Sequence, residues 1–335
     1  MPIAERPVLV APDSFKGTFS AAEVADAVAR GLESEGMAPD RCPVADGGEG
    51  TMQTLVAALG GTTATVTVSD PLGRPVDAAL GLVDGGATAI VEMAEASGLG
   101  RVGAQERDAE AASTAGTGEL MLAAVRKGAR RIVVTVGGSA TTDGGAGAIG
   151  AIDAGGGLGG AHVEVLCDVR TPFEDAARVY GPQKGADAAA VERLTRRLHE
   201  LAANLPRDPR GVPMTGAAGG LSGGLWAAFA AELRPGAAAV LDAVRFDERL
   251  RRAHAVVVGE GRLDRQTLQG KIIGAIEERC RRAGAPLHAI VGSTALEPAE
   301  LSALALQSVR VASSLREIEA AARALARELL AAAPA

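Results

Sequence analysis

Lysine, aromatic residues and cysteine are all scarce in this chain of 335 residues. Only four of its 34 basic residues are lysines, and aromatic residues make up 2% of the sequence. With a net charge of −7, the chain lacks both the basic surface and the stacking side chains that nucleic-acid-binding proteins use. We therefore expect the partner to be a small molecule and not a nucleic acid.

The three cysteines, Cys42, Cys167 and Cys280, lie far apart and form no CxxC pair. An odd number of isolated cysteines supports neither a disulfide framework nor a zinc cluster. The four histidines also stand apart along the chain, so they form no sequence pattern of metal ligands or catalytic bases. We interpret the cysteines as buried thiols of a protein in the reducing cytoplasm.

No segment has the character of a signal peptide or a membrane span. The N-terminal sequence MPIAERPVLVAPD lacks a long apolar core. The longest region of low charge, residues 132–152, is rich in glycine, serine and threonine and contains Asp143. We expect a soluble cytoplasmic protein that has no membrane partner.

Short apolar runs, glycine-rich polar loops and helical patterns follow one another along the chain. The clearest apolar runs are residues 8–11, 132–136 and 255–258. After the first run, Ser20 and Glu23 form a capping box that predicts a helix to about residue 34. This alternation is typical of α/β proteins, and the length favours two domains.

Residues 63–69 follow a different pattern. TATVTV alternates between apolar and polar residues, and the following PLG, residues 71–73, predicts a turn. We therefore expect an antiparallel pair of strands here. The segment LPRDPRGVP, residues 205–213, is the best candidate for a long loop.

Three glycine-rich loops contain acidic residues: DGGEGT at 46–51, GGSATTDGG at 137–145 and GEGRLD at 259–264. Backbone N–H groups of glycine can approach an anion closely, and acids among glycines suit a Mg²⁺ ligand or a base beside a polyphosphate. Taken singly, each glycine or acid is also explained as a turn residue. Together, the loops predict ATP–Mg²⁺ chemistry on a small acceptor.

The four lysines are informative as candidate site residues because the other basic residues of the chain are arginines. An ammonium group is a compact point charge, whereas a guanidinium group is a wide planar fork. Lys16, Lys184 and Lys271 each lie next to a glycine in a loop. Lys127 is explained as a cation at a helix C-terminus before Gly128.

Other nucleotide-binding patterns fit poorly. No GxxxxGK[ST] sequence occurs, so the chain is not a Walker A protein. Two GxGxxG matches begin at Gly145 and Gly155, and Asp168 follows at the position of a ribose-binding acid. The strand before the first match ends near Val136, too early for the tight strand-to-helix turn of a dinucleotide site. A dehydrogenase is therefore disfavoured.

Nine sequence motifs occur between residue 8 and about residue 294. They read APDSFKG, PVADGGEGT, IVEMAEASGL, GTGEL, GGSATTDGGAG, CDV, YGPQKGA, GAAGGLSGGL and VVVGEGRLDRQTLQGK. In order and wording this set resembles the bacterial glycerate kinase family of class I. The resemblance implies an ATP-dependent kinase of D-glycerate.

The same resemblance implies two α/β domains, one inserted in the other, with the active site in the cleft between them. We expect residues 1–62 and 250–335 to form a layered domain of flavodoxin-like or Rossmann-like type. Residues 63–249 would form the inserted α/β domain.

The expected product is 2-phosphoglycerate in preference to 3-phosphoglycerate. Two alternatives stay open: a kinase of a related small hydroxy acid or sugar acid, and a binding module for nucleotide or carboxylate that does not turn over. The resemblance leaves open whether the protein is a monomer or a homodimer.

Candidate residues follow from the loops and the resemblance. The catalytic candidates are Asp13, Ser14, Lys16, Asp46, Glu49, Asp168 and Lys184. The candidates for binding ATP are Gly137, Gly138, Ser139, Thr142, Asp143, Gly144, Gly145, Glu260, Gly261 and Lys271. The candidates for binding Mg²⁺ are Asp46 and Asp264.

Two segments that flank Asp168 are shorter than the family pattern. One lies between GGAGAIGAIDAGG and VEVLCDV, and the other lies between CDVRTPF and YGPQKG. Surface connections tolerate such shortening, which can also change a lid or a substrate wall. Arg265 stands in DRQT where the family more often has serine.

Overall fold

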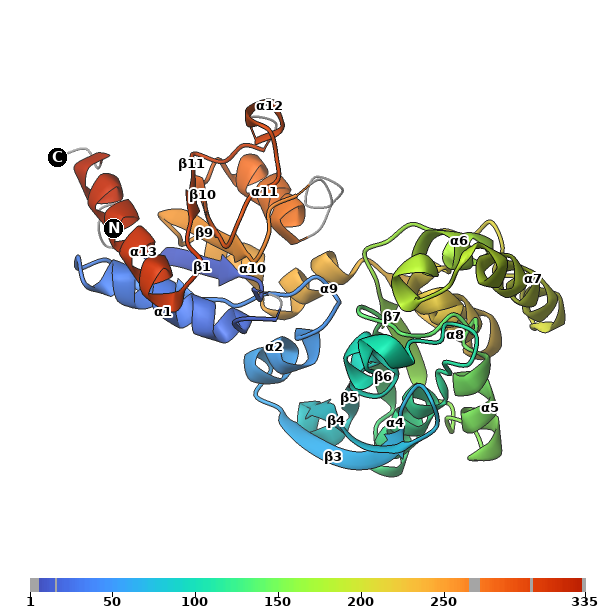
Figure 1. Cartoon of the computed structure of the whole chain (residues 1–335). Helices are drawn as coiled ribbons and strands as arrows, with labels where there is room; N and C mark the ends of the chain where they lie inside the picture. Colours follow the sequence, from blue (N-terminus) through green and yellow to red (C-terminus); the bar gives the residue numbers. More distant parts are fainter. Residues whose placement is uncertain (1–5, 16, 265–271, 302–303, 333–335) are drawn as a thin grey trace. The chain divides into compact units, whose positions relative to one another are not determined.

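The computed structural model describes residues 6–15, 17–264, 272–301 and 304–332, which form two compact units (Figure 1). Unit 1 comprises residues 1–46 and 237–335, and unit 2 comprises residues 47–236. Each unit contains a β-sheet with helices. The predicted architecture, an α/β domain inserted in another α/β domain, is confirmed.

The unit boundaries differ from the sequence-based ones at 62/63 and 249/250. Helix α2 (Thr51–Ala58) belongs to unit 2, where Val56 and Met52 pack over Gly81. Helix α10 (Phe246–Leu250) belongs to unit 1, where Arg249 pairs with Asp40 at 2.6 Å. A helical pattern identifies an apolar face but does not say which sheet that face covers.

Unit 1 is built on a five-stranded parallel sheet of order β11-β10-β9-β1-β2. Its strands are β1 (Val8–Pro12), β2 (Pro39–Arg41), β9 (Ala255–Glu260), β10 (Leu287–Val291) and β11 (Ser308–Val311). Counted along the sheet's own strands, this is the flavodoxin-like order 2-1-3-4-5. Its central strands β1, β9 and β10 are almost wholly buried, as expected for a parallel sheet covered on both faces.

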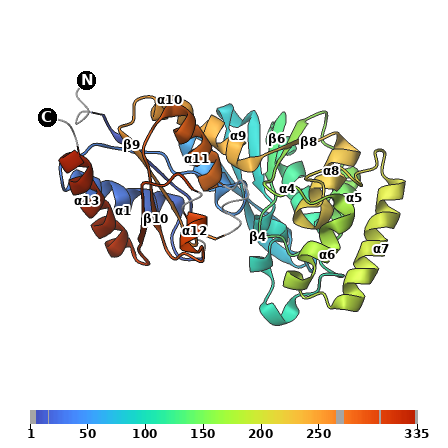
Figure 2. The ribbon, with the colours of Figure 1, turned by 90° about the horizontal axis from the view of Figure 1, so that it is seen from above.

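Helices α1 (Ala21–Glu33) and α13 (Leu315–Ala332) lie side by side on the sheet of unit 1 (Figures 1 and 2). The predicted capping box is present, because Ser20 accepts from Glu23 N and the Glu23 carboxylate accepts from Ser20 N. Gly31 permits the close packing, since a β-carbon there would lie 2.3 Å from Glu319 O. The other helices of this unit are α9 (Gly236–Ala243), α11 (Ile272–Ala283) and α12 (Pro298–Leu301).

Unit 2 contains a six-stranded sheet of order β3-β4-β5-β6-β7-β8. Its strands are β3 (Thr62–Ser69), β4 (Pro75–Val83), β5 (Thr88–Glu92), β6 (Arg131–Thr135), β7 (His162–Leu166) and β8 (Glu232–Arg234). Strands β3 to β5 are antiparallel, as the alternating TATVTV segment predicts, and β5 to β8 are parallel.

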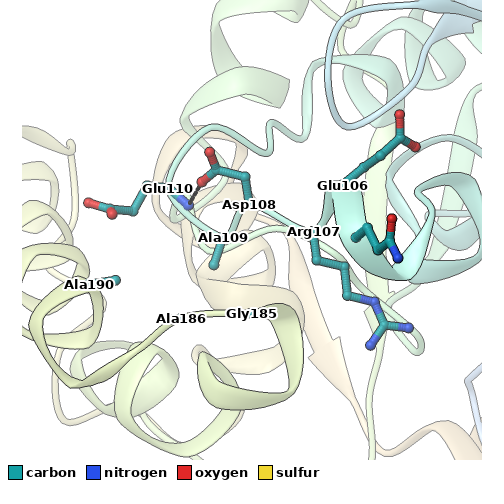
Figure 3. Close-up of a pocket in the computed structure, with 9 residues that line it drawn as sticks. Glu106, Arg107, Asp108, Ala109, Glu110, Gly185, Ala186 and Ala190 are labelled. Atoms are coloured by element: carbon teal, nitrogen blue, oxygen red, sulfur yellow. Dashed lines mark hydrogen bonds between the residues drawn. The ribbon is translucent and has the colours of Figure 1, made fainter.

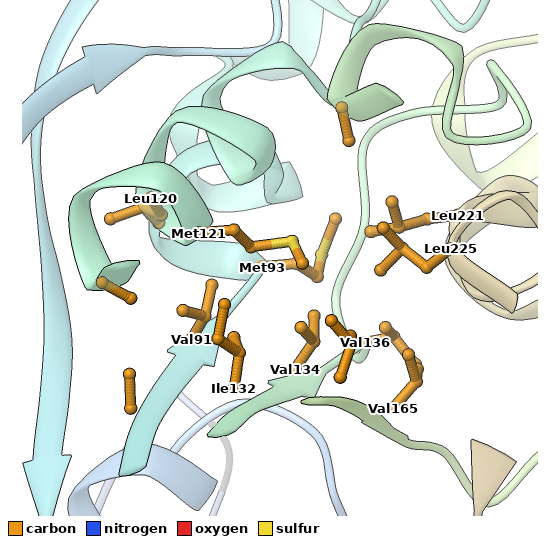
Figure 4. Packing of buried hydrophobic residues seen from close by; sticks show 14 of the residues in the cluster. Val91, Met93, Leu120, Met121, Ile132, Val134, Val136, Val165, Leu221 and Leu225 are labelled. Carbon is orange, nitrogen blue, oxygen red and sulfur yellow. The ribbon is translucent and has the colours of Figure 1, made fainter. Parts of the chain in front are cut away.

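One face of this sheet carries the main apolar core of unit 2 (Figure 4). Val91, Val134 and Val165 from successive strands point toward Met121 of α4 (Ala115–Arg126) and Leu221 of α8 (Leu221–Phe229). Helix α5 (Ala146–Ala154) adds to this core. A smaller core around Phe173 joins α6 (Ala176–Tyr180) to α7 (Ala188–Asn204). Among the described residues, no helix is both long and apolar enough to cross a membrane.

Candidate functional site

The carboxyl ends of β1 and β9 are neighbours in unit 1 and bring two predicted acids to one sheet edge. Asp13 follows β1, and its N–H donates to Gly259 O in β9 at 2.8 Å. Glu260 is the last residue of β9. In a sheet of this strand order, the edge between these two strands is the point where ligands bind.

Asp13 is 5% exposed, and its Oδ1 accepts from Ser14 N at 2.6 Å. Gly261 and Asp264 follow β9, and this segment is fixed to the loop after β10 by Leu263 N donating to Ser293 O at 2.9 Å. Lys16 and Lys271 lie outside the described residues.

Unit 2 has a second carboxyl edge, formed by the parallel strands β5, β6 and β7. Glu92 is the last residue of β5, Gly137 follows β6 and Asp168 follows β7. Two segments, here named the first glycine loop (residues 47–50) and the second glycine loop (residues 137–145), meet at this edge. The predicted residues of unit 2 thus gather at the sheet edge where α/β proteins bind ligands.

The two glycine loops are in direct contact. A β-carbon on Gly137 would lie 2.4 Å from the Cα of Gly48, and one on Gly138 would lie 1.9 Å from Glu49 Oε1. Gly138 also has a φ of +69°, a backbone conformation that favours glycine. Glycine is therefore required at 137 because the backbone of the first loop occupies the space of a side chain, and it is favoured at 138 by the positive φ.

The start of the second glycine loop presents backbone donors. Among the described residues, the N–H groups of Gly137, Gly138 and Ser139 have no hydrogen-bond partner. The loop is held by its other groups: Gly138 O accepts from Leu99 N at 2.8 Å, and Ala140 N donates to Ser97 O at 3.0 Å. Backbone N–H groups without a protein partner are available to an anion, so these residues are suitable for contacting a phosphate group.

Asp143 of the second glycine loop does not contribute a free carboxylate. It is 1% exposed, and its Oδ2 accepts from Thr114 N at 2.9 Å, Thr114 Oγ1 at 2.8 Å and Gly147 N at 3.1 Å. Its Oδ1 accepts from Gly145 N at 3.0 Å. The side chain therefore joins the start of α4 to the start of α5. It stabilises the second glycine loop through these buried hydrogen bonds.

Gly144 and the buried side chain of Thr142 complete this loop. Gly144 N donates to Gly219 O at 3.0 Å, so the GAAGGLSGGL segment packs directly on the loop. The hydroxyl of Thr142 is buried and has no hydrogen-bond partner among the described residues.

Lys184 lies beneath the second glycine loop, and its side chain is almost completely buried. Its Nζ donates to Ser139 Oγ at 2.7 Å and to Thr141 O at 2.6 Å. Burial lowers the pKa of this ammonium group to about 7, while Asp143 opposes the shift. Lys184, a candidate site residue in the sequence, therefore supports the second glycine loop from the interior of unit 2.

Glu92 is a residue of this edge that the sequence analysis did not single out. It is 4% exposed and accepts from Gly50 N at 2.9 Å and from Met52 N at 3.1 Å. Burial raises the pKa of its carboxyl group to about 7; the two backbone hydrogen bonds oppose the shift, and the charges of Glu95 and Glu49 add to it. The sequence signal that could have identified Glu92 is an acidic residue directly after the run TAIV.

A polar pocket of about 320 Å³ lies beside the turn that contains Lys184 (Figure 3). Gly185 forms part of its floor, and residues 105–110 form its wall. The acids of that wall are already engaged: Asp108 accepts from Glu110 N, and Glu110 pairs with Arg193 at 2.7 Å. The pocket therefore presents few uncommitted charges.

Comparison with known proteins identifies the family. Residues 8–156 and 154–334 match the model of the glycerate kinase family. The glycerate 2-kinase of Escherichia coli (strain K12) is 37% identical over 325 residues, and the glycerate kinase of Bacillus subtilis (strain 168) is 39% identical over 326 residues. Each alignment covers 85% of this chain and 85% of the relative.

A crystal structure described as glycerate kinase 2 from Salmonella typhimurium LT2 has a TM-score of 0.83 and 34% sequence identity. The match covers 97% of this chain and 98% of that chain. The two ranges that match the family model meet at residues 154–156, directly after α5. The chain therefore belongs to the glycerate kinase family, and it is a kinase.

Proposed function

We propose that the protein transfers the γ-phosphoryl group of ATP to D-glycerate in the presence of Mg²⁺, and that 2-phosphoglycerate is formed in preference to 3-phosphoglycerate. The observation that carries the proposal is the run of N–H groups at residues 137–139 that have no partner among the described residues, at the carboxyl edge of parallel strands in a glycerate kinase family member. The curated relatives with kinase names act on glycerate, which supports the choice of acceptor.

In this proposal the second glycine loop binds phosphate oxygens through backbone N–H groups. Phosphoryl transfer depends mainly on positioning and on neutralising charge, so a rigid loop of donors suits the reaction. Lys184 holds Ser139 and Thr141 in place. Glu49, beside Gly138, and Asp168, after β7, are the polar side chains we assign to the acceptor or its base in unit 2.

In unit 1 we assign Asp13 and Ser14, together with Lys16, to the carboxylate of glycerate or the transferred phosphoryl group. Glu260, Gly261 and Lys271 are assigned to the nucleotide. Asp46 and Asp264 would hold Mg²⁺, for which their hard carboxylate oxygens are suitable ligands. When bound, Mg²⁺ neutralises charge on the phosphate oxygens.

The proposal is tested by measuring ADP release from purified protein mixed with ATP, Mg²⁺ and D-glycerate. We expect turnover that stops when EDTA is added and that is absent without the acceptor. L-glycerate and longer hydroxy acids serve as comparison acceptors. Faster turnover with a longer acid would favour the related sugar-acid kinase.

Phosphorus NMR of the product then separates the two positions of phosphorylation, because the 2-phosphate and the 3-phosphate are on different carbons. We expect the 2-phosphate signal. If the protein binds ATP or glycerate but releases no ADP with any acceptor, the alternative of a binding module replaces the kinase proposal for this chain.

A further inference from the structure

We propose that Glu92 is a positioning residue that holds the first glycine loop in place, so that Glu49 stays against the second glycine loop. The inference rests on the proposed function only for its kinetic consequence. Its structural part concerns hydrogen bonds within unit 2 and is tested without turnover.

Glu92 is in direct contact with the start of α2. The Glu92 carboxylate receives Gly50 N at 2.9 Å on Oε1 and at 3.1 Å on Oε2, and Met52 N at 3.1 Å on Oε2. Gly50 precedes α2, and Met52 lies in its first turn. The first N–H groups of a helix have no partner within the helix, so an acid from another element can cap them.

Helix α2 has no side-chain cap of its own. Its N-cap is Gly50, which has no side chain to accept from the helix and has a φ of +88°. In most helices serine, threonine, aspartate or asparagine at this position provides the acceptor. Here the acceptor comes from the end of β5, which ties the first glycine loop to the sheet edge.

The first glycine loop contains the two residues that contact the second glycine loop. Glu49 immediately precedes Gly50, and its Oε1 lies where a β-carbon of Gly138 would be. Gly48 is packed in the same way against Gly137. A shift at Gly50 would therefore move the residues that are in contact with Gly137 and Gly138.

The charged groups around Glu92 oppose its ionisation. The charges of Glu95, which follows β5, and of Glu49 on the loop raise its pKa further, and α2 carries no charged residue. The hydroxyl of Thr135, its register partner on β6, is buried and has no hydrogen-bond partner among the described residues. The loop therefore depends on a carboxylate that is kept ionised mainly by the backbone N–H groups it accepts.

The pH dependence follows from this balance. Because the pKa of Glu92 is raised to about 7, the carboxyl group becomes protonated as the pH falls below that value. When the loop opens while Glu92 stays buried, the carboxyl group loses the two N–H groups that lower its pKa, so its pKa is higher in the open state and opening is favoured as the pH falls. We expect the first glycine loop to loosen below about pH 7.

The test compares wild type with Glu92→Gln by amide hydrogen exchange of the whole chain. Glutamine keeps the size but removes the charge and turns one acceptor into a donor. We expect the amides of Gly50 and Met52 to exchange faster by about tenfold or more in the variant. We also expect the exchange rates of these amides to lose the pH dependence that is expected for wild type. Glu119→Gln is the matched control, because Glu119 accepts from Ser69 N and Ser69 Oγ elsewhere in the same unit.

Kinetics provide the second readout. We expect Glu92→Gln to lower kcat by about 10- to 100-fold through misplacement of the loop, with a smaller change in KM for the nucleotide. We expect the activity of wild type to fall below about pH 7 and the activity of Glu92→Gln to lack this fall. Glu92→Asp, which keeps the charge but is one methylene shorter, should be defective as well.

The outcomes separate the two proposals. If the wild-type protein releases no ADP but Glu92→Gln still speeds amide exchange at residues 50–52, the kinase proposal fails and the positioning role of Glu92 stands. Unchanged exchange in Glu92→Gln would overturn the positioning role. So would equal loss of protection at 50–52 in Glu119→Gln, since the effect would then be a general loosening of unit 2.

Discussion

Lys184 Nζ lies 2.7 Å from Ser139 Oγ and donates a hydrogen bond to it inside unit 2. A second hydrogen bond to Thr141 O, at 2.6 Å, fixes the next part of the same loop. An ammonium group with this degree of burial costs free energy unless its hydrogen bonds are made. The lysine is thus a support for the second glycine loop, whatever contact it makes with a ligand.

The pH dependence of stability gives the first prediction. The pKa of Lys184 is lowered to about 7 in the folded protein, whereas the unfolded chain has the ordinary value near 10.5. Between these values the unfolded state binds more protons, so the contribution of Lys184 to stability is full above about pH 10.5 and is lost as the pH falls toward 7.

We therefore expect the difference in unfolding free energy between wild type and Lys184→Met to grow with pH, by up to about 1.4 kcal/mol per pH unit. Urea unfolding of both proteins between about pH 7 and pH 10 measures this difference. Lys127→Met, at an exposed helix end, is the control and should show no such slope. A flat difference would mean that Lys184 titrates normally in the folded protein.

Gly137→Ala gives the second prediction. The new β-carbon would lie 2.4 Å from the Cα of Gly48, a backbone atom that cannot rotate away. We expect a loss of about 1–3 kcal/mol in stability and slower ADP release, because the two glycine loops must separate. Thermal unfolding and the ADP assay measure the two effects.

Gly150→Ala is the matched control for this substitution. Gly150 lies within α5, and a β-carbon there would meet no atom within 4 Å. Alanine is the better helix former by up to about 1 kcal/mol, so we expect higher stability with unchanged turnover. If Gly137→Ala were as stable and active as wild type, the contact between the two loops would be looser than described.

Asp143→Ala gives the third prediction, which separates ligand binding from folding. The substitution leaves the N–H groups of Thr114, Gly145 and Gly147 without their acceptor in a buried position. We expect a loss of about 2–4 kcal/mol in unfolding free energy, since several hydrogen bonds to one buried charge are lost together. Chemical unfolding measures it, and activity at low temperature should fall in parallel with the folded fraction.

The contrary result would be a normally stable Asp143→Ala protein that has lost ATP binding. That outcome would return Asp143 to the direct ligand role that the sequence suggested. Asp153→Ala, near the end of α5 and exposed, is a control of the same chemical type.

Much of the fold was predictable from local patterns. The capping box at Ser20 and the apolar runs before the glycine loops produce the elements they predict, because caps and periodicity act over a few residues. The assignment of α2 to unit 2 was not predictable, because it depends on the packing of Met52 and Val56 over Gly81.

The grouping of the candidate loops at a sheet edge was predictable, but the contacts of each side chain were not. Asp143 and Lys184 were expected near a ligand, and the structure shows both with their polar atoms engaged inside the unit. Glu92 was missed because its partners, Gly50 and Met52, lie about 40 residues away in sequence. Sequence alone does not reveal which acid accepts from which distant N–H group.

The last prediction concerns His162, Glu164 and Glu232, which lie on neighbouring strands β7 and β8. Their ligand atoms all fall within 4.8 Å of one another, although the histidines appear isolated along the sequence. Both oxygens of Glu164 are already occupied, since Arg131 donates to Oε1 at 2.6 Å and to Oε2 at 3.0 Å.

Arg234 also donates to Glu164 Oε2, at 3.1 Å, and the hydrogen bonds from the two arginines keep the pKa of Glu164 below its ordinary value despite burial. A divalent cation would have to displace these guanidinium groups and would then lie beside their positive charges. We expect the melting temperature to be the same with added Zn²⁺ and with EDTA. Stabilisation by Zn²⁺ in wild type that disappears in His162→Gln would show that the group binds metal after all.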